Sequence, residues 1–329
     1  MTLTGRRAVL QVHPTRRCNL RCLHCYSSSG PDVDETTALP VLGRAVADAA
    51  ALGYDVLGVS GGEPLLYRPL TELLRTARTH GMRTTVTTNG MLLTERRLGE
   101  LTGLVDVLAI SLDGTPDSHV RMRQDARSFS AMERRLPLVR ASGIPFGFIF
   151  TLTQFNVHEL AWVADFAVAA GASLLQIHPL EPEGNAAGRL PGAVPDVTEM
   201  LFSVLEAARL RSSTDLTVQL DLVDRHSIVA QADRFLPDDE RPRGLAPWLS
   251  PLVIETDGTV VPLTYGFDRR FALGSLDEAP LSELARHWDP SPFRSLCRSV
   301  HADLAREDAP ALVNWYDEVT RAARTCQPA

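Results

Sequence analysis

The chain has 329 residues, a hydrophobic fraction of 44%, a formal net charge of −7 and a pI of about 5.7. This is long and apolar enough for one large domain, or for one domain with an appendage, around a sizeable core. The net negative charge and the lack of a basic stripe argue against a nucleic-acid-binding protein. No apolar run approaches the roughly 20 residues of a membrane span.

Two further features narrow the location and the class of protein. The amino-terminal residues contain no apolar core long enough for a signal peptide, so we expect a cytoplasmic protein. All 33 residues counted as Lys or Arg are arginine. Pyridoxal phosphate enzymes need a Schiff-base lysine and P-loop nucleotidases need the lysine of their GK[ST] motif. The sequence therefore excludes both classes.

Short apolar runs alternate with amphipathic runs through the first half of the chain. Strands are predicted at residues 8–13, 56–60, 83–87, 107–111, 146–152 and 174–178. Helices are predicted at residues 39–52, 69–80, 94–101, 129–141 and 157–170. This alternation predicts an α/β protein with a parallel sheet and right-handed crossovers. A barrel and an open doubly wound sheet both fit, and in both the ligand binds at the carboxyl ends of the strands.

The loop after the first predicted strand contains three of the five cysteines, Cys18, Cys22 and Cys25, spaced C-x3-C-x2-C. Clustered cysteines of this kind indicate a metal or redox site rather than a disulfide framework. Iron–sulfur cubes are normally held by four thiolates, so a triplet leaves one iron open to a small molecule. The alternative is a structural zinc site completed by His13 or His24.

Three more motifs follow the second, third and fourth predicted strands. They are Ser60-Gly61-Gly62-Glu63-Pro64, Thr87-Thr88-Asn89-Gly90 and Ile110-Ser111-Leu112-Asp113-Gly114. Each one alone is compatible with an ordinary turn. Together with the cysteine triplet, they indicate a single ligand site at the carboxyl ends of neighbouring strands.

These motifs resemble those of the radical S-adenosylmethionine (SAM) superfamily, and the resemblance covers about residues 8–184. It implies a partial (β/α)6 TIM-like barrel over residues 1–184 and a smaller α+β extension over residues 185–329. It also implies a [4Fe–4S] cluster on Cys18, Cys22 and Cys25, whose open iron chelates SAM. Reductive cleavage of SAM would then give a 5′-deoxyadenosyl radical that abstracts a hydrogen atom from the substrate.

The resemblance also implies SAM contacts for the motif residues. Arg123, in a stretch that resembles the family's HD-x-x-RG segment, would grip the SAM carboxylate. Val120 and Gln124 depart from that segment, so Arg121 is a rival candidate and a surface salt bridge is the alternative role of Arg123. The residues expected to bind SAM are Gly61, Gly62, Glu63, Pro64, Thr88, Asn89, Ser111, Asp113, Arg123 and Gln176.

The sequence changes character after the sixth predicted strand. Gln176, His178 and Glu181 would face the barrel mouth, either as substrate contacts or as structural polar groups. A segment rich in Gly, Pro and Ala then predicts a linker or active-site loop. Beyond it we predict a helix at 197–210, a strand at 216–220, a hairpin at 253–263, and helices near 281–288 and 309–324.

The hairpin and the run after it resemble the SPASM/twitch extension of peptide-modifying family members. Leu263 or Thr264 stands at the position of its cysteine, so we expect a single cluster in this chain. Without an auxiliary cluster to accept an electron, redox-neutral outcomes such as epimerisation, rearrangement or radical elimination are favoured. Cys297, Cys326 and Tyr265 are candidate hydrogen donors, and a thiol without a catalytic role is the alternative for each cysteine.

The extension implies a ribosomal peptide or a peptide-like natural product as the substrate. A small molecule such as an amino sugar, a cyclitol or a nucleoside is the alternative, and a non-enzymatic zinc-binding module is a third interpretation. The chemistry implies an electron donor such as flavodoxin or ferredoxin. Because only 17 residues precede Cys18, a peptide substrate would need either a separate leader-recognition protein or direct docking.

Overall fold

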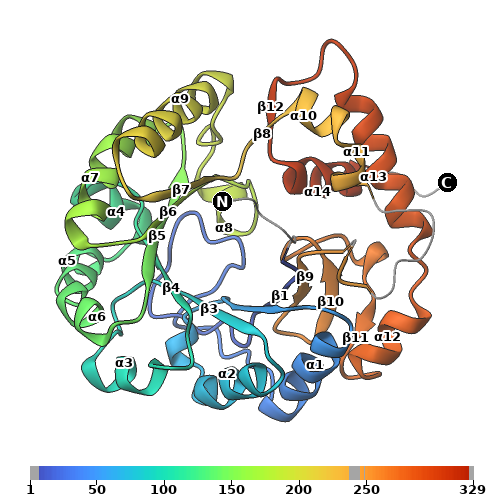
Figure 1. Cartoon of the computed structure of the whole chain (residues 1–329), viewed down its shortest axis with the longest axis horizontal. Helices are drawn as coiled ribbons and strands as arrows, with labels where there is room; N and C mark the ends of the chain where they lie inside the picture. Colours follow the sequence, from blue (N-terminus) through green and yellow to red (C-terminus); the bar gives the residue numbers. More distant parts are fainter. Residues whose placement is uncertain (1–6, 237–244, 248, 326–329) are drawn as a thin grey trace.

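The structure is a computed structural model that describes residues 7–236, 245–247 and 249–325. Figure 1 shows a curved ring of strands with helices around its outside. Ten of the described strands form one sheet in the order β11-β10-β9-β1-β2-β3-β4-β5-β6-β7, and β12 pairs with β8 in a separate two-stranded sheet.

The core of the sheet consists of parallel strands that the sequence predicted to within two residues at each end. They are β1 (Val9–Val12), β2 (Val56–Val59), β3 (Arg83–Thr88), β4 (Val107–Ser111), β5 (Phe146–Leu152) and β6 (Leu174–Pro179). Later strands are β7 (Thr217–Leu220), β8 (Val223–Asp224), β9 (Leu252–Ile254), β10 (Thr259–Pro262), β11 (Gly274–Ser275) and β12 (Leu312–Val313). The prediction of an α/β protein with a parallel sheet is confirmed.

Helices connect these strands and cover the outside of the sheet (Figure 1). In the first half they are α1 (Leu39–Ala51), α2 (Leu70–Thr79), α3 (Glu95–Leu101), α4 (Pro116–Arg123), α5 (Ser128–Glu133), α6 (Leu136–Ser142) and α7 (Leu160–Ala170). In the second half they are α8 (Asn185–Arg189), α9 (Val197–Ser213), α10 (Arg225–Ala230), α11 (Ala232–Phe235), α12 (Leu281–His287), α13 (Ser291–Leu304) and α14 (Trp315–Thr325). Short 3-10 turns cover Pro64–Leu66, Val157–Glu159 and Arg269–Phe271.

Some helix predictions were wrong, and proline accounts for one of them. The helix expected at 129–141 is two helices. Proline is disfavoured in a helix interior, so a new helix, α6, begins with Pro137 in its first turn. Helix α13 was missed, and it too has a proline in its first turn. The helix expected at 309–324 begins only at Trp315, after strand β12.

The two faces of the sheet differ in how completely they are buried. Side chains that alternate along the strands on the face towards the helices are apolar and 0–1% exposed, including Leu10, Val12, Leu57, Val59, Leu108, Ile110, Phe148, Phe150, Leu175 and Ile177. Residues between them face the inside of the ring and are only partly buried, including Gln11, Gly58, Thr85, Thr87, Ala109, Ile149, Thr151, Gln176 and His178. The inner face is therefore small, largely polar and open to a ligand.

The second half of the chain extends this same sheet at both edges. Strand β9 pairs in parallel with β1, placing Leu252 opposite Leu10, and β10 and β11 continue outward in antiparallel order. Strand β7 pairs in parallel with β6 at the other edge. The division into domains at residue 184 remains a prediction. Within the described ranges, no helix is both long and apolar enough to cross a bilayer.

Candidate active site

The cysteine loop, residues 13–38, connects β1 to α1 and lies inside the ring of strands, where Figure 1 draws it in blue. Cys18 and Cys22 are buried, and Cys25 is half-buried. Cys18, Leu20 and Cys22 form one apolar cluster, with Cys25 and Met91 packed against it. The three thiols thus share one enclosed space at the carboxyl end of β1.

The buried surroundings disfavour the deprotonated, negatively charged form of these thiols unless a cation is bound. Burial raises the pKa of Cys18 to about 12, and the nearby Glu63 and other two cysteines add to the rise. Burial also raises the pKa of Cys22 to about 11, although Arg123 opposes the rise. Thiolates packed this way suit a cationic cluster that neutralises them together. Over the described ranges, no three or more His, Cys, Asp or Glu side chains converge on a single metal ion, but the thiolates of a cube bind separate irons.

The glycine-rich loop after β2 packs directly on the backbone of the cysteine loop. The Gly62 N–H donates to the Thr15 carbonyl at 2.8 Å, and the Glu63 N–H donates to the Arg17 carbonyl at 2.9 Å. A Cβ atom on Gly61 would lie 2.7 Å from the Thr15 carbonyl oxygen, and one on Gly62 would collide with the Arg17 carbonyl. These glycines are therefore required by the contact between the two loops, in addition to any ligand.

Glu63 joins the loops after β2 and β3. It is fully buried, and its Oε1 accepts from Thr88 Oγ1 at 2.8 Å while its Oε2 accepts from the Asn89 N–H at 2.9 Å. Burial raises its pKa, and these hydrogen bonds partly offset the rise. The Asn89 side chain in turn donates to Asn19 of the cysteine loop at 2.9 Å. Pro64 starts the short turn that follows. The predicted motifs are thus brought together by a connected hydrogen-bond network.

Asp113 and Arg123 form a buried ion pair beside the thiols. Arg123 Nε donates to Asp113 Oδ2 at 2.5 Å, and Arg123 Nη1 lies 3.8 Å from Cys22 Sγ. Burial acts to raise the pKa of Asp113, but Arg123, His24 and His119 hold it well below its usual range. Arg123 is only 8% exposed, so the alternative of a surface salt bridge is wrong. Ser111, two residues before Asp113, is also buried at the end of β4.

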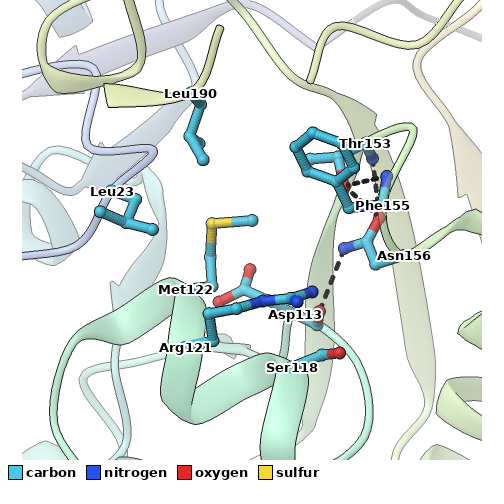
Figure 2. A pocket seen from close by; sticks show the side chains of 9 residues that line it. All are labelled: Leu23, Asp113, Ser118, Arg121, Met122, Thr153, Phe155, Asn156 and Leu190. Atoms are coloured by element: carbon cyan, nitrogen blue, oxygen red, sulfur yellow. Dashed lines mark hydrogen bonds between the residues drawn. The ribbon is translucent and has the colours of Figure 1, made fainter. Parts of the chain in front are cut away.

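A pocket of about 250 Å³ lies next to this ion pair (Figure 2). Its lining combines apolar and polar side chains: Leu23, Met122, Phe155, Leu190, Asp113, Ser118, Arg121, Thr153 and Asn156. Asn156 closes one side by donating to the Asp113 carbonyl at 3.0 Å. The Asp113 Oδ1 atom is buried without a hydrogen-bond partner, and His24 Nε2 lies 3.7 Å from it. This carboxylate oxygen therefore keeps the capacity to accept one more hydrogen bond.

A second polar group lies at the ends of β6 and β7, and the sequence foresaw only part of it. His178 lies 2.9 Å from Asp221 through Nδ1 and 3.3 Å from Glu181 through Nε2. Gln176 donates to the same Asp221 carboxylate at 2.6 Å. Asp221 was missed, because it carries no motif and only the pairing of β7 with β6 brings it to His178. Burial acts to lower the pKa of His178, but the two carboxylates raise it to about 10.

The segment after β6 is hydrogen-bonded to the cysteine loop. Asn185 donates from its backbone to the Cys25 carbonyl at 2.8 Å and from its side chain to the Cys22 carbonyl at 3.0 Å. Gly184 has a φ of +53°, and a Cβ atom there would lie 2.5 Å from the Cys25 carbonyl oxygen. The sequence predicted a linker or an active-site loop for this stretch, and its contacts with the cysteine loop favour the second of these.

The predicted hydrogen donors occupy different surroundings. The Tyr265 ring packs against His13 and Tyr26, with ring centroids 4.7 Å and 5.8 Å away, so it borders the cysteine loop. Burial raises its pKa to about 12. Cys297 is buried in the apolar core on α13, a helix that packs against α10 and α14. Cys326 lies outside the described residues.

The site and fold together define the class of domain. Residues 12–167 match the model of the Radical SAM superfamily. The chain therefore contains a radical SAM domain, and members of that superfamily are enzymes that use a [4Fe–4S] cluster and SAM. This finding favours the cluster over the zinc-binding module predicted as an alternative.

Two relatives show how far the similarity extends. Fe-coproporphyrin III synthase of Methanosarcina barkeri is 33% identical over 162 residues, which are 49% of this chain and 41% of that protein. PqqA peptide cyclase of Ruegeria pomeroyi is 30% identical over 264 residues, which are 75% of this chain and 65% of that protein. The chain thus spans between 41% and 65% of the lengths of these two relatives.

The fold resembles that of a solved SAM complex. Streptococcus suis SuiB bound to S-adenosylmethionine has a TM-score of 0.67 and 17% identity, covering 88% of this chain and 68% of that one. The similarity confirms the partial barrel and is compatible with a carboxyl-terminal extension.

Proposed function

We propose that this chain is a radical SAM enzyme that modifies a ribosomal peptide or a peptide-like natural product. The observation that carries the proposal is the enclosed trio of thiols with the loops after β2, β3 and β4 bonded around it. When bound, the cluster and SAM would supply a 5′-deoxyadenosyl radical able to abstract hydrogen from an unactivated carbon.

Different residues of the chain would bind the cluster and SAM. Cys18, Cys22 and Cys25 would hold the cluster, leaving one corner for SAM. Arg123 would face the SAM carboxylate while Asp113 keeps it oriented, and the free Asp113 Oδ1 would accept a ribose hydroxyl. The remaining predicted SAM residues are proposed to shape or line the same site: Gly61, Gly62, Glu63, Pro64, Thr88, Asn89, Ser111 and Gln176.

The inner face would exclude bulk water and orient the substrate. Tyr265 borders the cysteine loop and is the donor candidate best placed to meet a substrate radical. Cys297 would have to act from the apolar core, so we rank it below Tyr265, and Cys326 stays a prediction. A single cluster in this chain also stays a prediction, and with it the preference for epimerisation, rearrangement or another redox-neutral outcome.

A peptide substrate is supported by the relative PqqA peptide cyclase, whose match at 30% identity covers 75% of this chain. A tetrapyrrole is the second candidate, because relatives named for haem synthesis also match, one of them over 84% of this chain. Charge favours the peptide. Tetrapyrroles with several carboxylates need free cations, whereas at the ends of β6 and β7 the single cation His178 is shared by the two carboxylates Glu181 and Asp221, which leaves a net negative charge there.

The arginines of the cysteine loop do not offset those carboxylates, since each is already ion-paired within the loop. The pairs are Arg16 with Glu35, Arg17 with Asp34, and Arg21 with Asp32. A separate leader-recognition protein and a flavodoxin- or ferredoxin-type electron donor belong to the proposal, as does a cytoplasmic location.

The first experiment tests the chemistry. The protein is purified and reconstituted without oxygen, assayed for iron and acid-labile sulfide, and incubated with SAM and dithionite. We expect about four irons and four sulfides per chain, and release of 5′-deoxyadenosine. One tightly held zinc without sulfide would contradict the proposal.

The second experiment tests the substrate class. The reconstituted protein is offered a precursor peptide encoded beside its gene and, separately, iron coproporphyrin III, each with SAM and dithionite. We expect a mass change in the peptide and none in the porphyrin. The opposite result would assign the tetrapyrrole, and no change in either would point to the small-molecule class.

A further inference from the structure

Two buried serines follow the last cysteine of the triplet and contact its sulfur. Ser27 Oγ lies 3.5 Å from Cys25 Sγ, and the Ser29 N–H donates to the same sulfur at 3.3 Å. The two serine hydroxyls lie 2.7 Å from each other. Both side chains are almost fully buried, at 3% and 5% exposure. A metal-bound thiolate has no proton, so Ser27 must donate to it, and Ser29 then donates to Ser27.

The backbone around these serines is held in place. Arg16 donates from Nε to the Ser27 carbonyl at 3.0 Å and from Nη2 to the Ser28 carbonyl at 3.2 Å, while its guanidinium pairs with Glu35. Ser28 adopts a left-handed φ of 49°, which turns the chain back so that the Ser29 N–H reaches Cys25. The donors to the sulfur are therefore fixed by tertiary contacts.

Hydrogen bonds to a thiolate act unequally on the two oxidation states of a cluster. The reduced state carries one more negative charge, so donors to its sulfurs stabilise it more and raise the reduction potential. The effect is stronger in an enclosed, water-poor space, where each bond has a larger electrostatic energy.

We propose that the Ser27–Ser29 hydroxyl pair raises the reduction potential of the cluster by donating to the Cys25 thiolate. The inference rests on the proposed function, since it needs a cluster on this cysteine. The other two thiolates receive different donors: Cys22 receives Arg123, and Cys18 receives a backbone N–H from Leu20. The serine pair can therefore be altered without changing any residue proposed to bind SAM.

The test is a redox titration, followed by electron paramagnetic resonance, of the reconstituted protein with dithionite and mediators. We expect Ser27→Ala to have a more negative midpoint potential than the unaltered protein, at equal iron and sulfide content. Ser29→Ala should show a smaller shift in the same direction, because its backbone N–H remains. Ser27→Thr keeps the hydroxyl and should restore the original potential.

Ser28→Ala is the matched control, because it lies between the two serines but its hydroxyl is not a donor to Cys25. Its potential should equal that of the unaltered protein. An unchanged potential in Ser27→Ala at full cluster content would overturn the inference. If Ser27→Ala fails to retain iron, an unchanged potential in Ser29→Ala would overturn it instead. Absence of iron and sulfide from the unaltered protein would reject the proposed function itself.

Discussion

The two faces of the central sheet are made by the same strands but carry different residues. On β5, Phe148 faces the helices and is completely buried, whereas its neighbour Ile149 faces the inside of the ring and stays partly exposed. On β6, Ile177 is completely buried, while His178 is a third exposed and bonded to two carboxylates. The outer face follows the demands of packing, and the inner face departs from them where a ligand would bind.

The outer face of the sheet thus contributes mainly to stability, and the inner face contributes mainly to ligand binding. Truncating an outer residue leaves a cavity that the surrounding helices cannot fill. Altering an inner residue changes a surface that already borders open space. Substitutions on the two faces should therefore give distinct signatures, and the following experiments test whether they do.

The largest effect is expected at the cysteine loop on the inner side. Cys22→Ala should abolish cluster binding and 5′-deoxyadenosine release, because two remaining thiolates are too few to retain a [4Fe–4S] cluster. Iron and sulfide assays after anaerobic reconstitution check this. Cys297→Ala, a buried cysteine on α13, is the control and should keep its iron. Equal iron in both variants would contradict the assignment of the ligands.

The outer face should give the largest loss of stability. Phe148→Ala is expected to lower the free energy of unfolding by about 3–5 kcal/mol, because its fully buried ring leaves a cavity against Phe146 and Phe166. Ile149→Ala on the same strand should cost about 1–2 kcal/mol, since it is already partly exposed. Urea denaturation of both variants measures the difference. Equal losses would mean that the inner face is packed like the outer one.

Gly62 tests the contact between the glycine-rich loop and the cysteine loop. Gly62→Ala should lower the free energy of unfolding by about 1–3 kcal/mol, because its Cβ collides with the Arg17 carbonyl. It should also reduce iron retention by displacing the cysteine loop. Gly43→Ala in α1 is the matched control: a Cβ there meets no atom within 4 Å, so the variant should gain about 0.5–1 kcal/mol. A Gly62→Ala protein as stable as this control would refute the contact.

The smallest effect is expected at His178 and depends on pH. Its pKa is raised from 6.5 to about 10 in the folded protein, so the folded state keeps a proton that the unfolded chain loses. The resulting stabilisation is complete below about pH 6.5 and disappears as the pH rises through 10. Because the side chain is partly exposed, we expect at most about 1 kcal/mol. Urea midpoints between pH 6 and 10 should decline more in the unaltered protein than in His178→Gln, and parallel declines would contradict the prediction.

Local sequence was sufficient for the six core strands β1 to β6 and for the motifs that follow them, whereas the short strands β8, β11 and β12 were not predicted. The strands at 107–111 and 146–152 were predicted to the residue, because apolar runs of that length bounded by turns leave little choice of structure. The cysteine triplet and the Gly61-Gly62-Glu63 loop were recognisable for the same reason, since their chemistry is set by spacing along the chain. Asp113 and Arg123 were both identified, but their mutual ion pair was not.

Contacts between distant segments were decided by the tertiary structure alone. Asp221 reaches His178 only because β7 pairs with β6, and Asn185 caps the Cys22 and Cys25 carbonyls only because the chain returns after β6 to the loop inside the ring. Tyr265 borders Tyr26 because the carboxyl-terminal hairpin adds to β1 across more than 200 residues of sequence. Which distant segments come into contact depends on how the whole core packs, and no local pattern encodes that choice.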